Sequence, residues 1–269
     1  MASASLIFCT VNCGTTNFTT ITIKSILKFH PTAKVFVVDV VPSKKFIVQD
    51  KSLAGNIELV SGISQKDTTL PLIDISRIEN LSDEDKQIAI ARLGNPYKVL
   101  FRGSFNHSEN IQLAIDTIDE NFILLDSDAP LIRPVDFIDN SSITIAERFE
   151  LDASGSGIKL LSNVFVKFYP FIQYLNVDMM RKFDVWYYHA DRLKDFLKTA
   201  IVSGQGDKTS LWFDTGCLLA SQIDTKRLRW GSIKYMDYVD HFGQASGTRG
   251  IKYSKNWIDS WKAKLNVKW

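Results

Sequence analysis

The sequence lacks several features that mark specialised classes of protein. It has only three cysteines, Cys9, Cys13 and Cys217, and these form no CxxC pair and no Cys/His cluster at zinc spacing. An odd number of cysteines favours free thiols in a reducing compartment over a disulfide framework. No apolar run approaches the roughly 20 residues needed to cross a bilayer, and the N-terminal MASAS lacks the basic start of a signal peptide. We therefore expect a soluble, cytoplasmic protein.

The chain also lacks an excess of charge of either sign. Its 32 Lys and Arg residues nearly balance its 30 Asp and Glu residues, so bulk electrostatics give no reason to expect a nucleic-acid partner. The 45% hydrophobic and 23% charged residues are ordinary for a globular protein, which excludes wholesale disorder. With 269 residues, no internal repeat and no linker, a single large domain is the better prediction.

Strands and helices alternate in the first part of the chain. Leu6–Asn12 and Ala33–Val41 are apolar, as buried strands are, and Thr15–Phe29 between them has a helical pattern that ends at His30-Pro31. Asn56–Val60 predicts a third strand. This order is the signature of βαβ units and hence of a parallel α/β sheet. No GxGxxG follows the first strand, so the dinucleotide fingerprint is absent.

The stretch Asn121–Asp128, NFILLDSD, carries the strongest chemical signal. Phe122–Leu125 predicts a strand buried on both faces, which delivers Asp126, Ser127 and Asp128 at its carboxyl end. Ligands of open α/β sheets bind at that end, and carboxylates suit Mg²⁺ or Mn²⁺. A metal holding a phosphorylated substrate is therefore one interpretation, and an acidic turn after a strand is the other.

The segment Gly103–Asp119 predicts a helix that leads into this strand. Asn106 and Glu109 resemble a capping box at its start. Antiparallel packing on the sheet would bring that first turn close to Asp126 and Asp128, where backbone N–H groups would meet a phosphate. His107 lies in the same turn and is either part of that contact or a surface histidine.

The later chain yields further elements. We expect a strand at Ser142–Ala146 and an edge or bent strand at Val164–Tyr174, around Pro170. Helices are expected at Asn176–Phe183 and Arg192–Ile201, followed by a polar loop at Val202–Lys208. A turn at Asp214-Thr215-Gly216 opens a further helix, and His241 lies in a short strand or loop.

In their order along the chain, these motifs resemble the nucleotide-sugar domain of GT-A glycosyltransferases. The likeness rests on the first strand and helix, Asp39 after the second strand, FILLDSD, the aromatic strand with its proline, WFDTG and VDHFGQAS, and it is similar to the inverting, family-2-like branch. It implies one GT-A domain over residues 1–269, with a Rossmann-like, mixed but mostly parallel sheet flanked by helices. Residues 1–130 would bind the nucleotide sugar and residues 131–269 the acceptor.

The resemblance also implies an activity and a site. The enzyme would be a hexosyltransferase-like glycosyltransferase that moves a sugar from a nucleoside-diphosphate donor, such as a UDP-sugar, to a hydroxyl of a glycan, lipid-linked or other acceptor. Mn²⁺ or Mg²⁺ would be held by Asp128, Asp126 and His241. The donor would contact Thr10, Asn12, Asp39, Asn106, His107, Asp126 and Ser127.

An inverting transfer needs a general base within hydrogen-bond reach of the acceptor hydroxyl. Asp214 in WFDTG matches the family's acidic motif, although Phe213 stands where an acid often precedes this residue. A helix N-cap is the structural alternative for Asp214, and Asp152, Asp178 and Asp184 are weaker candidates. A retaining mechanism stays open, because residue spacing does not show which face of the sugar is attacked.

Two other functions are compatible with parts of the sequence. A dehalogenase-like phosphatase also ends a strand in DxD, but that family places the motif near the N-terminus and adds a later GDxxxD, and neither holds here. A non-catalytic sugar- or nucleotide-binding protein would bind donor without releasing nucleoside diphosphate.

The tail Lys252–Trp269 interleaves lysines with Trp257, Trp261 and Trp269. Trp257 and Trp261 are four residues apart, so they share one face of a helix. The tail either makes a weak contact with a membrane surface or packs as an amphipathic last helix against the domain.

Overall fold

The computed structural model describes residues 5–14, 16–40, 51–68, 82–84, 86–87, 102–152, 158–160, 164–189, 201–205, 208–212, 215–242 and 251–265. The helix expected at Arg192–Ile201 lies outside these residues except for Ile201. The strands are β1 Ile7–Asn12, β2 Lys34–Asp39, β3 Ile57–Ser61, β4 Phe122–Asp126, β5 Thr144–Asp152, β6 Ile158–Leu160, β7 Val164–Leu175, β8 Ile201–Gln205, β9 Lys208–Trp212 and β10 Gly231–Ser232. The helices are α1 Thr16–Phe29, α3 Arg102–Thr117, α4 Val177–Lys182, α5 Cys217–Lys226 and α6 Ile251–Leu265, with 3₁₀ turns at Lys51–Asn56 and Tyr235–Asp237.

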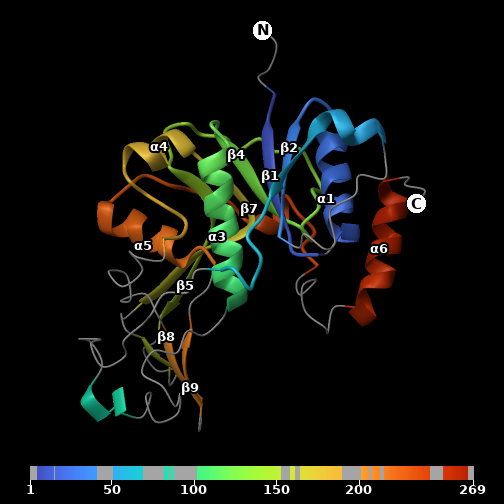
Figure 1. Cartoon of the computed structure of the whole chain (residues 1–269). Coiled ribbons are helices and arrows are strands. Elements are labelled where there is room, and N and C mark those ends of the chain that lie inside the picture. Colours follow the sequence, from blue (N-terminus) through green and yellow to red (C-terminus); the bar gives the residue numbers. More distant parts are fainter. Residues whose placement is uncertain are drawn as a thin grey trace.

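A seven-stranded sheet in the order β10-β5-β7-β4-β1-β2-β3 forms the centre of the molecule (Figure 1). Neighbouring strands run parallel except at β7, which is antiparallel to both β4 and β5. The predicted fold class, a mixed but mostly parallel α/β sheet flanked by helices, is confirmed.

The register of the parallel strands brings three polar residues to one edge. Asn12 at the end of β1 pairs with Asp39 at the end of β2, and Val11 pairs with Asp126 at the end of β4. All three strands point the same way, so their carboxyl ends form a single edge of the sheet. In open α/β sheets, this is the edge at which ligands bind.

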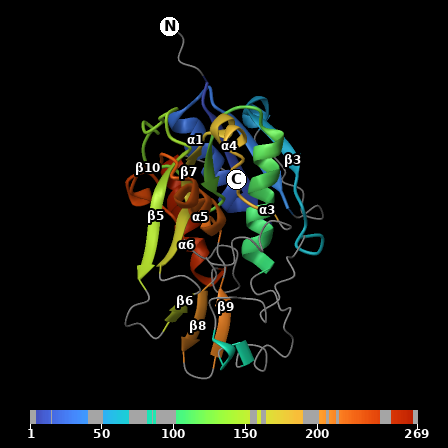
Figure 2. The same ribbon diagram turned by 90° about the vertical axis from the view of Figure 1, so that its left-hand side faces the viewer.

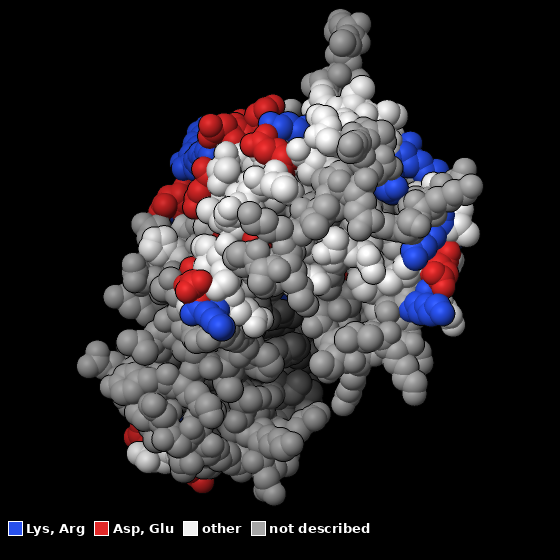
Figure 3. Space-filling view, turned by 45° about the vertical axis from the view of Figure 1, so that its right-hand side comes forward, with Lys and Arg blue, Asp and Glu red and all other residues white. Residues whose placement is uncertain are grey.

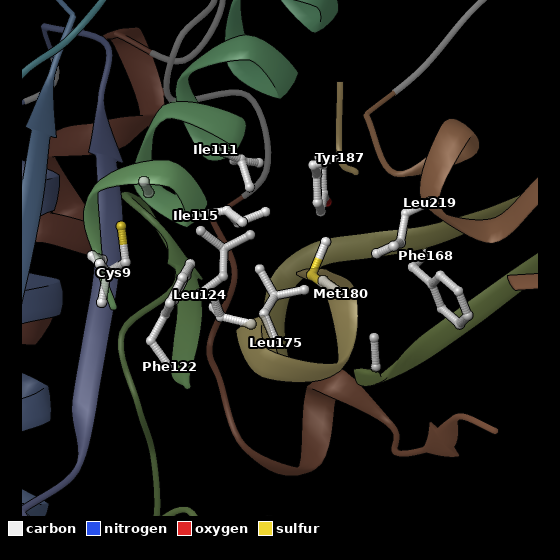
Figure 4. Close-up of a cluster of buried hydrophobic side chains, with 14 of the residues drawn as sticks. Cys9, Ile111, Ile115, Phe122, Leu124, Phe168, Leu175, Met180, Tyr187 and Leu219 are labelled. Atoms are coloured by element: carbon white, nitrogen blue, oxygen red, sulfur yellow. The ribbon is translucent and has the colours of Figure 1, made fainter. Parts of the chain in front are cut away.

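Two hydrophobic clusters cover the two faces of the sheet. On one face, Ile111 and Ile115 of α3, Met180 of α4 and Leu219 of α5 pack against the strands, as Figure 4 shows. On the other face, Ile23 and Ile26 of α1 pack with residues of the segments that follow β4 and precede α6. Among the described residues, no helix combines the length and the apolar composition needed to cross a membrane.

The prediction that Val164–Tyr174 is an edge strand is wrong, since β7 lies between β4 and β5. A bent strand was the alternative, and the pairing with β5 does shift its register between Ala146 and Arg148. Pro170 falls in this irregular stretch, opposite no residue of the β5 ladder. Because proline has no N–H to offer, it is tolerated inside a sheet at such an irregularity.

Helix α5 is preceded by Gly216 as its N-cap, and the φ of 86° at this position favours glycine. A Cβ atom at this position would collide with the carbonyl oxygen of Phe168 in β7. The turn before α5 is thus pressed directly against the sheet.

A smaller sheet in the order β6-β8-β9 lies below the main body in the view of Figure 2. The strands β8 and β9 pair antiparallel from Ile201↔Trp212 to Gln205↔Lys208. The prediction of a polar loop at Val202–Lys208 is therefore wrong, because most of this segment belongs to a hairpin. Its polar residues gave no alternating hydrophobic pattern from which the strands could be recognised.

Candidate functional site

Asp126 and Asp128 lie where β4 ends and the chain turns. The Ala129 N–H donates to the Asp126 carbonyl oxygen at 3.1 Å, which closes the turn. From α1, the Thr22 hydroxyl donates to the Ser127 carbonyl oxygen at 2.9 Å and fixes the turn from the other side. Ser127 and Asp128 are both buried, at 7% and 5% exposure. The two carboxylates are thus held by backbone structure rather than displayed on a free loop.

His241 reaches these carboxylates through antiparallel pairing of two segments that are distant in sequence. The Ile132 N–H donates to the Tyr238 carbonyl oxygen, the Asp240 N–H to that of Pro130, and the Phe242 N–H to that of Asp128, at 2.8 to 3.0 Å. This ladder places His241 Nε2 3.3 Å from Asp128 Oδ1.

The imidazole ring of His241 is also held by a neighbour from β7. It stacks on Phe171 with ring centroids 3.7 Å apart and an interplanar angle of 26°. Sequence reasoning missed Phe171, although an aromatic residue beside the proline of a strand was a visible signal. The stack limits the directions in which His241 can present its nitrogen atoms.

Asp126, Asp128 and His241 form a compact group of potential metal ligands. Each offers one ligand atom, and the three atoms lie within 4.8 Å of one another. Burial raises the pKa of Asp126, and Asp128 adds to the rise, while His107, His241 and the Ser127 N–H oppose it. Two carboxylates and an imidazole are a donor set that Mn²⁺ and Mg²⁺ accept, and a cation would relieve the cost of ionising Asp126. The residues therefore fit the expected ion.

His107 lies next to this group, on α3. Its Nε2 atom is 3.8 Å from Asp126 Oδ1. The helix begins at Arg102, earlier than expected, so the prediction that Asn106 caps it is wrong. The backbone N–H group of His107 lies inside the helix and bonds to the preceding turn, so His107 approaches Asp126 with its side chain.

The Asn106 side chain has a different task from the one predicted for it. Its amide donates to the Ile63 carbonyl oxygen at 2.8 Å and to Thr68 Oγ1 at 2.7 Å. These bonds tie α3 to the segment that follows β3. A contact of Asn106 with a donor stays a prediction.

The ends of β1 and β2 are joined by side chains. Asn12 Nδ2 donates to Asp39 Oδ1 at 3.0 Å, and Thr19 of α1 donates to Asn12 Oδ1 at 3.0 Å. Asp39 is half-buried at the end of β2, on the same edge of the sheet as Asp126 and separated from β4 by β1. Thr10 lies deeper in β1, where its hydroxyl oxygen is buried and has no hydrogen-bond partner among the described residues. The structure thus brings Asn12 and Asp39 to the edge and places Thr10 behind them.

Cys13 is a residue of this edge to which sequence reasoning gave no role. It is exposed as a whole residue, yet desolvation of its thiol and the negative charges of Asp126, Asp128 and Asp39 raise its pKa to about 12. The carboxylates of Asp39 and Asp126, at two strand ends, and of Asp128, in the turn after β4, therefore all raise the pKa of the Cys13 thiol. A position immediately after the first strand was the only signal in the sequence.

The predicted general base, Asp214, lies outside the described residues. Of its rivals, Asp178 is in the first turn of α4, which follows β7. The last residue of β7, Leu175, pairs with Phe122 at the start of β4, so α4 lies at the opposite end of the sheet from Asp126. Asp184 follows the same helix. Neither carboxylate is brought to the site, and for Asp152 only the backbone, at the end of β5, is described.

The charged residues visible in Figure 3 are interspersed: Lys and Arg side chains lie close to Asp and Glu side chains over the described surface. This agrees with the balanced charge of the sequence.

No family model matches the chain, and no curated protein matches it in sequence. Among solved structures, it is similar to core-mannan synthase A from Aspergillus fumigatus in its Mn/GDP form, with 11% identity, 89% of this chain and 75% of that chain covered, and a TM-score of 0.46. It is also similar to the glycosyltransferase GlyE of Streptococcus pneumoniae TIGR4, with 9% identity, 86% of this chain and 45% of that chain covered, and a TM-score of 0.43. The galactosyltransferase LgtC in complex with donor and acceptor sugar analogs has 13% identity, with 72% of this chain and 63% of that chain covered and a TM-score of 0.38. The chain spans less than two thirds of the length of GlyE and LgtC.

Proposed function

We propose that the chain is a metal-dependent GT-A glycosyltransferase that uses a nucleoside-diphosphate sugar. The observation that carries the proposal is the group of Asp126, Asp128 and His241, whose ligand atoms lie within 4.8 Å at the carboxyl edge of the sheet. Asp128 and His241 would hold the ion most directly, because they are already 3.3 Å apart. Asp126 would complete the set from the end of β4.

The neighbouring strand ends suit the nucleotide. Asn12 and Asp39 form a hydrogen-bonded pair beside the carboxylates, and we assign them to the nucleoside, with Ser127, Asn106 and Thr10 as secondary contacts. His107 would approach the diphosphate, since its Nε2 atom is 3.8 Å from Asp126 Oδ1. When bound, a divalent cation supplies electrostatic stabilisation of the charge that develops on the diphosphate leaving group.

We further propose an inverting transfer with Asp214 as general base and a UDP-sugar as donor. The basis is the resemblance of WFDTG to the acidic motif of the inverting, family-2-like branch. Residues 131–269 would receive the acceptor hydroxyl, from a glycan or a lipid-linked sugar. Proton NMR of the first-formed product would distinguish inversion from retention by its anomeric coupling.

A thermal-shift panel tests the central claim. UDP-, GDP-, CMP- and dTDP-sugars would be added with and without Mn²⁺, and we expect one nucleotide class to raise Tm by several degrees only when Mn²⁺ is present. Asp128→Ala should abolish this shift. The matched control is Asp119→Ala, which removes a highly exposed carboxylate that lies 3.2 Å from the guanidinium group of Arg181. Absence of a metal-dependent shift for every donor would sink the proposal.

The panel also separates a transferase from a binding protein. A transferase should release nucleoside diphosphate when donor and acceptor are both present. Asp214→Asn should keep the thermal shift and lose the release. A donor-dependent shift without release in the wild type, over a broad acceptor set, would favour the non-catalytic binding protein.

A further inference from the structure

The C-terminal helix α6 lies against α1, beside the main sheet (Figure 1). Trp261 points into the protein and is only 4% exposed. Trp257 packs against Phe18 of α1, with ring centroids 5.3 Å apart, and against Trp261 at 6.1 Å. The two tryptophans that share a helical face are thus used for packing, as one of the two hypotheses for the tail predicts.

Both residues that flank His241 in the sequence are attached to α6. The indole N–H of Trp261 donates to Asp240 Oδ2 at 2.8 Å, and the ammonium group of Lys264 lies 3.9 Å from the same oxygen. On the other side, the ring of Phe242 lies 5.2 Å from that of Trp257. His241 therefore stands between two residues that both contact α6, and Phe242 also packs on Phe18 of α1, with ring centroids 5.2 Å apart.

Contacts from other elements also hold this segment. The Asp240 and Phe242 N–H groups each donate one bond to the turn after β4, to Pro130 and Asp128 respectively, and the rings of His241 and Phe242 pack on Phe171 of β7 and Phe18 of α1. A short segment of this kind depends on side-chain packing to stay closed. The contacts from α6 add a hydrogen bond to a carboxylate on one side and an aromatic cluster on the other, and hydrogen bonds to charged groups are among the stronger ones.

We propose that Trp261 is a positioning residue for His241, and that α6 acts as a brace which sets the third ligand of the metal group. Trp261 touches neither the ion nor the donor. It fixes the Asp240 carboxylate towards α6, which holds the backbone of residues 240–242 in register with residues 128–130. The link to metal affinity rests on the proposed function, whereas the link to local order does not.

The test compares Trp261→Phe with the wild type. Phenylalanine keeps most of the packing and removes the N–H donor. Hydrogen exchange without metal should show the Phe242 amide exchanging about tenfold faster. Trp186→Phe is the control, because Trp186 is similarly buried, at 6% exposed, but its backbone carbonyl oxygen accepts a hydrogen bond from Gln222 of α5, away from α6. Unchanged exchange at residues 240–242, or the same change in the control, would overturn the proposal.

Mn²⁺ affinity, measured by the EPR signal of the free ion, gives the second readout. Trp261→Phe should weaken binding by up to about tenfold. This is at or below the roughly 10- to 100-fold cost of losing an outer partner of a ligand, because Trp261 bonds to Asp240 and acts on His241 through the backbone. In a His241→Ala background the same substitution should have no further effect, since it acts through His241. An equal loss in both backgrounds would overturn the proposal. If the wild type binds no Mn²⁺, the proposed function fails, and the exchange experiment still decides the role of Trp261.

Discussion

Two acidic sites at opposite ends of the sheet use the same side chain in opposite ways. Asp139 precedes β5 and accepts hydrogen bonds from the Ser141 N–H at 2.9 Å and the Ser142 hydroxyl at 2.8 Å, with Arg229 3.3 Å away. The Ser141 and Ser142 donors, helped by Arg229, lower the pKa of Asp139 to about 2. At the other end, burial raises the pKa of Asp126. Hydrogen bonds from its own turn stabilise the ionised form of Asp139, whereas burial makes Asp126 costly to ionise.

The two carboxylates differ in whether their surroundings favour the ionised form: those of Asp139 do, and those of Asp126 do not. Donors around Asp139 are built into its own turn, so the site needs nothing from solution. Around Asp126 the side chains that act on its pKa are two histidines and a second carboxylate. A buried carboxylate with a raised pKa suits a ligand of opposite charge, as the proposed function requires, and each of the following substitutions probes that distinction.

Asp128→Asn should have the largest effect, because the proposed function makes Asp128 a direct ligand of the ion. We expect Mn²⁺ affinity to fall by more than about a hundredfold, beyond the cost of losing an outer partner. Titration followed by EPR of the free ion measures this. Asp139→Asn should bind Mn²⁺ like the wild type, and an equal loss in both variants would erase the contrast between the two sites.

His241→Ala should have the next largest effect, weakening Mn²⁺ binding by roughly 10- to 100-fold. The carboxylates stay in place in this variant, so binding should be reduced rather than abolished. Isothermal titration calorimetry gives the affinity. Wild-type affinity in His241→Ala would remove the histidine from the metal group and leave only the acidic pair.

Asp126→Asn should raise the Tm of the metal-free protein by a few degrees at neutral pH. The folded pKa of Asp126 is raised, so its favourable contribution is present below the ordinary aspartate pKa of about 3.9 and is lost as pH rises through the raised value. The advantage of the variant should therefore shrink towards pH 4. Thermal unfolding in EDTA across this range checks the sign, and a variant less stable than the wild type at pH 7 would contradict it.

Asp139→Asn should have the smallest effect, a slightly lower Tm at neutral pH. The pKa of Asp139 is lowered to about 2, so its contribution is complete above the ordinary value of about 3.9 and disappears as pH falls towards 2. Wild type and variant should therefore converge in acid, opposite to the trend at Asp126. Unfolding curves between pH 2 and 7 test this, and parallel curves would show that the carboxylate charge is not used.

Much of the fold was predictable from local pattern. The apolar runs at β1, β2 and β4 gave those strands and their parallel order, and Asn176 was expected to open a helix, which it does as the N-cap of α4. The start of α3 was wrong because the side chain of Asn106, which resembled a cap, bonds instead to Ile63 and Thr68, which are far away in sequence. Local rules cannot show a partner of that kind.

The site was predictable in its residue types but not in its supports. Asp126 and Asp128 follow a buried strand, and this pattern alone predicts their place at the sheet edge. The nearness of His241 depends on a backbone ladder with residues 128–132, and its orientation on Phe171. Tertiary pairing decides such contacts, and no periodicity in the sequence records it. Asp214 stays a prediction.

Because residues 238–242 pair with residues 128–132, the order of biosynthesis affects the site. The carboxylates emerge from the ribosome long before His241, roughly a hundred residues later, and closing so long a loop carries an entropic cost. A nascent chain would display an acidic strand end without its histidine until α6 has been made. The ability to capture an ion would then arise late, as one of the last steps of folding.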